Sequence, residues 1–184
     1  MNGSKHILIC GEVGSGKSTL ISGLLEHNTR PVYGFLTKKL SPDESGIHPI
    51  YIHSAGSDTK LYEEYNLVGT CDKKIRSINP NAFNTLGVDY LKATQNGIIV
   101  MDELGFMEVD AKAFTSAVFR ALNGSIPVIA AVKARYDIPF LNDVRSHKNA
   151  KLYIITKDNR DELFKELLPI VLMWNKMNIL DFPK

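Results

Sequence analysis

The stretch from Gly11 to Ser18 constrains this chain most, because it has the spacing G-x-x-x-x-G-K-[ST] of a phosphate-binding loop. The apolar run 7–10 before it predicts a buried strand, and the residues after it place apolar side chains on one face of a helix. Glycines let the backbone wrap around a phosphate with its N–H groups pointing inward, and the start of a helix adds a positive dipole. We therefore expect these residues to bind a phosphate chain: Gly11, Glu12, Val13, Gly14, Ser15, Gly16, Lys17, Ser18 and Thr19.

A second apolar run, residues 97–101, ends in the carboxylates Asp102 and Glu103. An apolar strand that ends in Asp is the magnesium-side element of proteins that bind nucleoside triphosphates through this loop. Lys17 is expected to reach the β- and γ-phosphates, and Ser18 and Asp102 are expected to hold Mg²⁺. Glu103 is then placed to orient or deprotonate a water that attacks the γ-phosphate.

Basic residues are needed as well, because phosphoryl transfer develops negative charge that a cation should stabilise. Arg135 follows the core strand 128–132 at its carboxyl end and is the candidate catalytic cation besides Lys17. Lys133 reads more readily as a solvated surface charge. Two interpretations of Glu108 stay open: a group that fixes a basic side chain, or a surface carboxylate before a helix.

Strand-like and helix-like segments alternate along the chain, which predicts an α/β domain built on a mostly parallel sheet flanked by helices. The turn Ser41–Gly46 predicts an inserted hairpin, and Pro49 favours an edge position for its second strand. Asp110 is the expected N-cap of the helix that follows it. The expected strands are 32–36, 47–53, 97–103, 126–132 and 151–155, and the expected helices are 80–95, 110–122 and 159–172.

Length and composition predict one soluble domain over residues 1–184, with 44% hydrophobic and 23% charged residues. Within it, the segment 54–77 has a weak, polar pattern, which we interpret as variable and mobile, and the tail 174–184 has no assignment. The net charge of +2 is too small to favour a nucleic-acid partner, and Cys10 and Cys71 lack metal-ligand spacing. No apolar run reaches ~18 residues and the start lacks an apolar signal core, so we expect a cytoplasmic protein without a membrane segment. We also expect a monomer.

Motifs along most of the chain resemble those of one family. Residues 34–37 read Gly-Phe-Leu-Thr, residues 102–108 read Asp-Glu-Leu-Gly-Phe-Met-Glu, and residues 155–161 read Ile-Thr-Lys-Asp-Asn-Arg-Asp. They resemble the Gly-Phe-x-Thr, Asp-Glu-Ile-Gly-Lys-Met-Glu and Val-Thr-x-x-Asn-Arg-Asp motifs of the THEP-type nucleoside-triphosphatases, the family that includes the cancer-related nucleoside-triphosphatase. The matches run in order from Ile7 to about Leu168, and the second motif is the most specific.

This resemblance implies a magnesium-dependent hydrolase that converts ATP, GTP and other nucleoside triphosphates to the diphosphate and phosphate. It implies a P-loop NTPase fold related to the RecA-like group, with a catalytic Glu after the metal Asp. Asn159 and Arg160 lie where the last motif approaches the base or ribose. The chain departs from the family in having Lys38 and Lys39 after the first motif, and Phe106 where the family often has Lys. If that Lys supplies catalytic charge, this protein must use another cation.

Two other classes of function use the same loop. A nucleotide or small-molecule kinase transfers the phosphate to an acceptor and normally needs a lid that carries arginines. Arg76 is the single Arg in the segment 54–77, which weakens this alternative. A nucleotide-gated switch without turnover does not need Glu103, so that residue favours the hydrolase.

Overall fold

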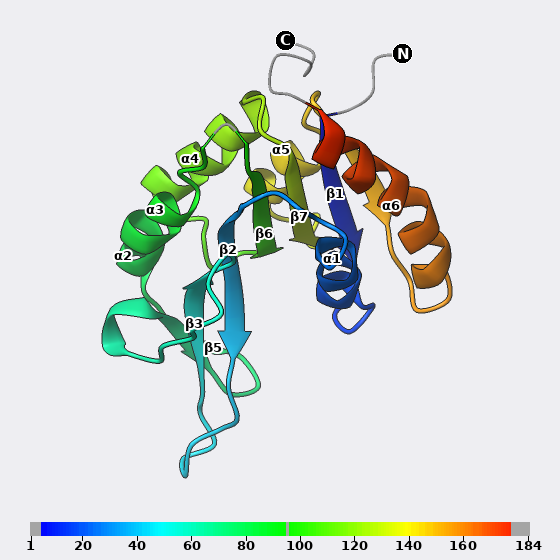
Figure 1. Ribbon diagram of the computed structural model, residues 1–184. Helices are drawn as coiled ribbons and strands as arrows, with labels where there is room; N and C mark the ends of the chain where they lie inside the picture. Colours follow the sequence, from blue (N-terminus) through cyan, green and yellow to red (C-terminus); the bar gives the residue numbers. More distant parts are fainter. Residues whose placement is uncertain (1–4, 95, 178–184) are drawn as a thin grey trace.

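One eight-stranded sheet runs through the computed structural model, which describes residues 5–94 and 96–177. Its strands are β1 (His6–Gly11), β2 (Val32–Lys39), β3 (His48–Ser54), β4 (Leu67–Cys71), β5 (Ile75–Ile78), β6 (Ile98–Leu104), β7 (Val128–Lys133) and β8 (Ala150–Ile154). Their order in the sheet is β5-β4-β3-β2-β6-β7-β1-β8 (Figure 1). The helices are α1 (Lys17–Leu25), α2 (Pro80–Ala82), α3 (Val88–Tyr90), α4 (Lys112–Asn123), α5 (Pro139–Arg145) and α6 (Arg160–Lys176), with a short 3₁₀ helix at η1 (Glu64–Asn66) and a short π-helix at η2 (Phe83–Gly87).

Five neighbouring strands, β2, β6, β7, β1 and β8, pair in parallel. Three of them, β1, β6 and β7, are near-continuous apolar runs because both of their faces are buried. In β1, for example, Leu8 packs on one face, and Ile7 and Ile9 pack on the other. The expected mostly parallel sheet flanked by helices is confirmed.

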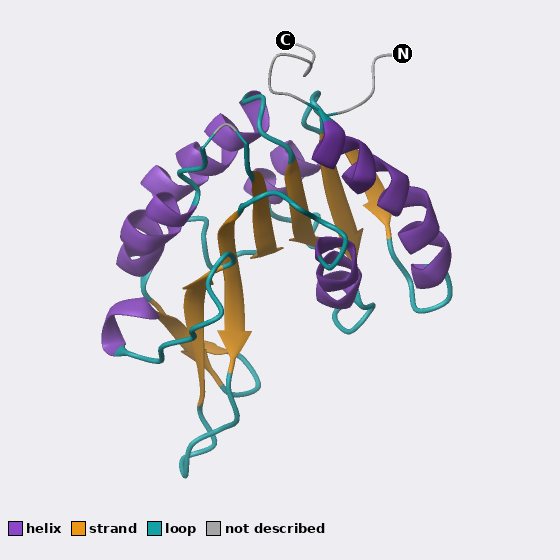
Figure 2. Cartoon of the chain, viewed as in Figure 1, coloured by secondary structure: helices purple, strands orange, loops and turns teal. Residues whose placement is uncertain are grey.

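Helices cover both faces of this parallel half (Figure 2). On one face α1 packs against α6, and Leu24 and Trp174 are buried there. On the other face lie α4, α5 and the helical run from α2 to α3, which contribute Phe114, Leu141 and Phe83 to the buried core there. The sheet is therefore the middle of three layers, and its strand ends remain open for a site.

The other half of the sheet is antiparallel, with β2, β3, β4 and β5 paired in sequence order. The prediction that Pro49 marks an edge strand is wrong, because β3 lies between β2 and β4. Leu40 donates its N–H to the Pro49 carbonyl at 3.0 Å, and Pro49 has no N–H to return. His48 Nδ1 donates to the Leu40 carbonyl at 2.9 Å instead, so a side chain replaces the missing backbone bond.

The segment 54–77, left without strands above, contains η1, β4 and most of β5. Val68 and Cys71 of β4 are buried, whereas three of the four residues of β5 are exposed. Because β5 lies at the edge and buries little, its sequence lacks the apolar run by which the other strands are found. β5 was missed for that reason, and β4 was missed because Gly69 and Thr70 interrupt its apolar residues.

Three helix predictions need correction, and one helix was missed. Asp110 does not cap α4, which begins at Lys112; the Asn84 side-chain oxygen accepts from the N–H groups of Ala113 and Phe114 at 3.0 and 3.1 Å. The helical run that begins at Pro80 ends at Tyr90, so it is shorter than the expected 80–95, of which residue 95 lies outside the described residues. Helix α5 was not predicted. Helix α6 continues to Lys176, into the tail that had no assignment, and residues 178–184 lie outside the described part of the chain.

Candidate active site

The glycines of the phosphate loop set its path between β1 and α1. Gly14 and Gly16 have φ values of 77° and 97°, in the left-handed region that favours glycine. At Gly11 the constraint is space, because a Cβ there would lie 2.5 Å from the Ile155 carbonyl oxygen. The loop therefore holds a compact turn at the carboxyl end of β1, and α1 starts directly after it at Lys17.

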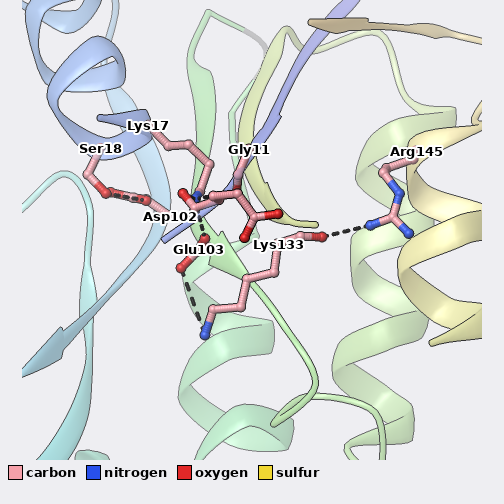
Figure 3. A network of polar contacts seen from close by, with 8 residues as sticks. Gly11, Lys17, Ser18, Asp102, Glu103, Lys133 and Arg145 are labelled. Carbon is pink, nitrogen blue, oxygen red and sulfur yellow. Dashed lines mark hydrogen bonds and ion pairs between the residues drawn. The ribbon is translucent and has the colours of Figure 1, made fainter. Parts of the chain in front are cut away.

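Lys17 is the buried cation of the loop, with 6% of its surface exposed. Its Nζ donates to the carbonyls of Gly11 and Glu12 at 2.9 and 3.0 Å (Figure 3). The same Nζ lies 3.0 Å from Oε1 of Glu103. The loop lysine and the carboxylate at the end of β6 therefore meet, although 86 positions separate them in the chain.

Ser18 and Asp102 form the second contact between α1 and β6. The Ser18 hydroxyl donates to Oδ1 of Asp102 at 2.9 Å. Burial raises the pKa of Asp102, while the Ser18 hydroxyl and Lys17 act in the opposite direction. The predicted metal residues thus lie side by side, and both present oxygen atoms.

Lys133, read above as a solvated surface charge, belongs to this cluster. Its Nζ lies 3.8 Å from Oε2 of Glu103 and 5.7 Å from the centre of the Phe106 ring. Its backbone carbonyl accepts from Nη1 of Arg145 at 2.7 Å. Arg145, from α5, is mostly buried and also donates to the Arg135 carbonyl at 2.9 Å, so it fixes the chain after β7. Arg145 directly follows the stretch 138–144, which contains Asn142 and Asp143, and no local sequence pattern marked it as a functional residue.

Arg135 itself lies apart from Lys17, Asp102 and Glu103, with no ion pair or hydrogen bond to them among the described residues. Its side chain makes two bonds to the Asp137 carboxylate, at 2.9 and 2.7 Å. These bonds lower the pKa of Asp137 to about 2. The guanidinium also lies 5.6 Å from the centre of the Phe106 ring.

The residues of the last motif lie on the other side of the loop. The Asn159 side chain accepts from the Thr156 N–H at 2.8 Å and donates to the Ile154 carbonyl at 3.0 Å, which shapes the turn between β8 and α6. Arg160 is the first residue of α6 and lies against the loop, since a Cβ on Gly16 would be 3.0 Å from its Cδ. Of the two, the Arg160 side chain is the one beside the phosphate loop.

Glu108 is a buried carboxyl group on the chain between β6 and α4, with 3% of its surface exposed. Its Oε2 accepts from the Gly105 N–H at 2.9 Å, so it holds the turn that follows Glu103. Burial raises the pKa of Glu108 to about 7, and the nearby Lys133 acts in the opposite direction. Of the two interpretations left open above, the exposed surface carboxylate is excluded.

Comparison with known proteins agrees with this arrangement. A family model described as NTPase matches residues 6–168. The chain belongs to this family. The resemblance stated above is thereby confirmed, and with it the assignment to the nucleoside-triphosphatases, which are hydrolases of acid anhydrides.

Relatives extend over nearly the whole chain. The nucleoside-triphosphatase THEP1 of Aquifex aeolicus is 26% identical over 174 residues, covering 90% of this chain and 98% of the relative. The cancer-related nucleoside-triphosphatase homolog of Mus musculus is 23% identical and covers 91% and 97%. The crystal structure of Aquifex aeolicus THEP1 shares the fold, with a TM-score of 0.71, 23% identity and coverage of 90% and 98%. Among the described residues, no helix combines the length and apolarity needed to cross a bilayer.

Proposed function

We propose that this NTPase hydrolyses the γ-phosphate of ATP, GTP and other nucleoside triphosphates, with Mg²⁺ as cofactor, giving the diphosphate and phosphate. The observation that carries the proposal is the meeting of Lys17 and Glu103 at 3.0 Å at the mouth of the glycine loop. Lys17 can stabilise the charge that develops on the phosphate oxygens, and Glu103 can orient and deprotonate the attacking water.

Each residue has a role in the displacement. Glu103 accepts a hydrogen bond from the attacking water and then its proton, as the water oxygen bonds to the γ-phosphorus. The bond from that phosphorus to the bridging oxygen breaks, and the diphosphate leaves with the electron pair. Lys17 and the loop N–H groups stabilise the charge on the phosphate oxygens. Lys17 and Lys133 also offset the negative charge of Glu103, which otherwise repels the substrate.

The residues present fit a magnesium ion that binds together with its substrate. The hydroxyl of Ser18 and the carboxylate of Asp102 offer oxygen ligands 2.9 Å from each other. The described residues contain no group of three or more His, Cys, Asp or Glu that could hold a metal by themselves. Mg²⁺ suits such a site, because it commonly keeps several waters and binds through one or two protein oxygens plus phosphates, where it neutralises developing charge.

The proposal also covers the base selectivity of the enzyme, its compartment and its oligomeric state. Phosphates and metal supply most of the affinity, so base selectivity is loose, with Arg160 and the turn of Asn159 as the groups nearest the nucleoside. The proposal includes a cytoplasmic monomer that acts on free nucleotides. The net charge of +2 is too small to favour nucleic acid as a partner, which supports free nucleotides as substrates. The thiols of Cys10 and Cys71 are free and buried, which supports a reducing compartment such as the cytoplasm.

Phosphate release from a panel of nucleotides tests this proposal. We expect release from ATP and GTP alike, and none in excess chelator. Asp102→Asn should raise the Mg²⁺ concentration for half-maximal rate more than it weakens nucleotide binding, whereas Asp58→Asn, an exposed control, should change neither. Full activity without a divalent metal would contradict the role of Ser18 and Asp102. Release that depends on an added acceptor would favour the kinase.

A further inference from the structure

A cavity of about 610 Å³ lies beside Glu103, on the side of the phosphate loop that faces the antiparallel half of the sheet. The β2–β3 hairpin extends beyond the carboxyl ends of the parallel strands, where the phosphate loop lies (Figure 1). Residues of this hairpin line one wall of the cavity. Pockets of this size take small organic ligands. The lining includes Val13 of the loop, Thr37 and Lys39 of β2, Ile50 of β3, the β4–β5 turn from Cys71 to Ile75, the chain from Gly105 to Glu108, Glu103 and Lys133.

The charge of this cavity is unbalanced toward the positive. Lys39, Lys73 and Lys74 line it, and none of the three has an ion-pair partner within 5–94 and 96–177. They come from two separate elements, β2 and the β4–β5 turn. Lys133 adds a fourth ammonium group at the end next to Glu103.

The carboxyl groups of the lining do not neutralise these lysines. Asp72 is bonded to the Arg76 guanidinium, with Nε at 2.9 Å. Glu103 is held by Lys17. Glu108 is buried, bonded to the Gly105 N–H, and has a pKa raised by burial to about 7. Lys39, Lys73 and Lys74 are thus left to bind an anion from outside the chain.

The rest of the lining is apolar. Ile50, Ile75, Phe106 and Met107 contribute to it, and Met107 is buried. A ring or a short carbon skeleton can pack on these side chains while an acidic group meets the lysines.

The triphosphate, as the proposed function places it, does not fill this cavity. In that function the γ-phosphate lies at Lys17 and Glu103, which contact each other, and the nucleoside lies toward Arg160, which packs against Gly16 of the loop. We propose that the cavity, here called the lysine cavity, binds a second small molecule, an organic anion with a phosphate or carboxylate group on an apolar body, next to the γ-phosphate. This inference rests on the proposed function, because that function places the triphosphate.

Pyridoxal 5′-phosphate is a suitable probe, since it joins an aromatic ring, a phosphate and an aldehyde. A lysine amine attacks the aldehyde carbon and water leaves; borohydride then donates hydride to the imine carbon and leaves a stable secondary amine. The protein is first saturated with Mg²⁺ and a non-hydrolysable ATP analogue to protect Lys17. Modified lysines are then mapped by mass spectrometry over a range of probe concentrations.

We expect Lys39, Lys73 or Lys74 to react at least about tenfold faster than Lys38, because an anion site concentrates the probe beside them. Lys38 is the matched control, since it precedes Lys39, is exposed and does not line the cavity. Pyridoxal without the phosphate should lose this preference. The double variant K73E/K74E should slow the modification of Lys39 at least about fivefold, whereas K38E should leave it unchanged.

Equal reaction of Lys38 and Lys39, or equal preference for pyridoxal without phosphate, would overturn the inference. So would an unchanged rate at Lys39 in K73E/K74E, provided that its thermal unfolding matches that of the parent. The state of Lys17 reports on the proposed function separately. If Lys17 is modified despite the analogue, triphosphate binding in the loop has failed, whatever the lysine cavity does.

Discussion

The parallel and antiparallel halves of the sheet differ in how far their strands are buried. The parallel half is covered by helices on both faces, and the residues of its strands from Ile98 to Met101 and from Val128 to Val132 are all buried. The antiparallel half leaves β5 with three exposed residues and projects the β2–β3 hairpin beyond the body of the molecule. The buried parallel half supports the phosphate loop, and the antiparallel half forms one wall of the cavity beside that loop.

This difference decides where chemistry can be precise. Side chains at the ends of buried strands are held on both sides, which is why Lys17 and Ser18 meet Glu103 and Asp102 at 3.0 and 2.9 Å. Preorganised groups of this kind lower the cost of reaching a transition state. We therefore expect changes at the end of the parallel half to reduce turnover, and changes in the antiparallel half to affect stability.

Lys17→Ala gives the largest effect and tests the first part of this comparison. It removes the buried cation aimed at the β- and γ-phosphates, so turnover should fall at least about 10³-fold, the scale found for cations that stabilise a transferring phosphoryl group. Phosphate release at saturating nucleotide is the measurement. Lys92→Ala, which removes an exposed lysine paired with Asp89, is the control and should keep the parent rate. Turnover within threefold of the parent for Lys17→Ala would refute the role of the loop.

Glu103→Gln separates binding from catalysis at the same site. The change keeps the shape and removes the acceptor charge, so turnover should fall by roughly 10²–10⁴, the range for a positioned acid or base. Nucleotide affinity should stay the same or increase slightly, because a negative charge near the γ-phosphate is lost. Glu44→Gln in the exposed β2–β3 turn serves as control for both readouts. A parent-like rate in Glu103→Gln would favour the kinase or switch over the hydrolase.

Glu108 lies where the two halves meet, and we expect it to make the free energy of unfolding depend on pH. Its pKa in the folded protein, about 7, is above the ordinary value of 4.5. The folded state therefore keeps the proton longer, and the stability that this provides is complete below pH 4.5 and is lost as pH rises to about 7. Glu108→Gln stays neutral at every pH and can still accept from Gly105, so above pH 7 it should be more stable than the parent by about 3 kcal/mol.

Urea unfolding at pH 4, 6 and 8 measures this effect. The two proteins should have similar free energies of unfolding at pH 4 and diverge as the pH increases. Glu44→Gln, which changes an exposed carboxyl, should follow the parent at all three values. Parallel curves for Glu108→Gln and the parent would mean that Glu108 is not held as a buried carboxyl.

The same contrast explains how much the sequence could predict. The strands around Ile9, Val100 and Ala130 were predicted because a strand that is buried on both faces has a continuous apolar sequence. The loop and its two carboxylates were predicted because glycine geometry and strand ends fix their positions. Lys133 was misjudged, since only the tertiary fold brings its Nζ within 3.8 Å of Glu103.

What the sequence could not predict depends on contacts between distant segments. The cap of α4 is Asn84, which comes from a different helical segment. The sequence around Asp110 therefore could not show that Asp110 does not cap this helix. β4 and β5 were missed because their burial is partial and their pairing includes a bulge. Pro49 misled for a specific reason: proline avoids interior strands unless another group replaces its N–H.

The hydrogen bond that His48 makes in place of the missing Pro49 N–H gives the smallest predicted effect, and it tests how the antiparallel half is stabilised. His48 Nδ1 donates to the Leu40 carbonyl, which Pro49 cannot serve. His48→Ala should cost about 1 kcal/mol, the net value of one hydrogen bond, without changing turnover. In a protein that also carries Pro49→Ala, the new N–H can reach Leu40, so the loss of His48 should cost less, with a coupling of about 0.5 kcal/mol or more. Urea unfolding of the two single variants, the double variant and the parent completes the cycle. Strict additivity would show that the imidazole does not stand in for the missing N–H, whereas a loss of turnover in His48→Ala would show that this half does more than support the wall of the site.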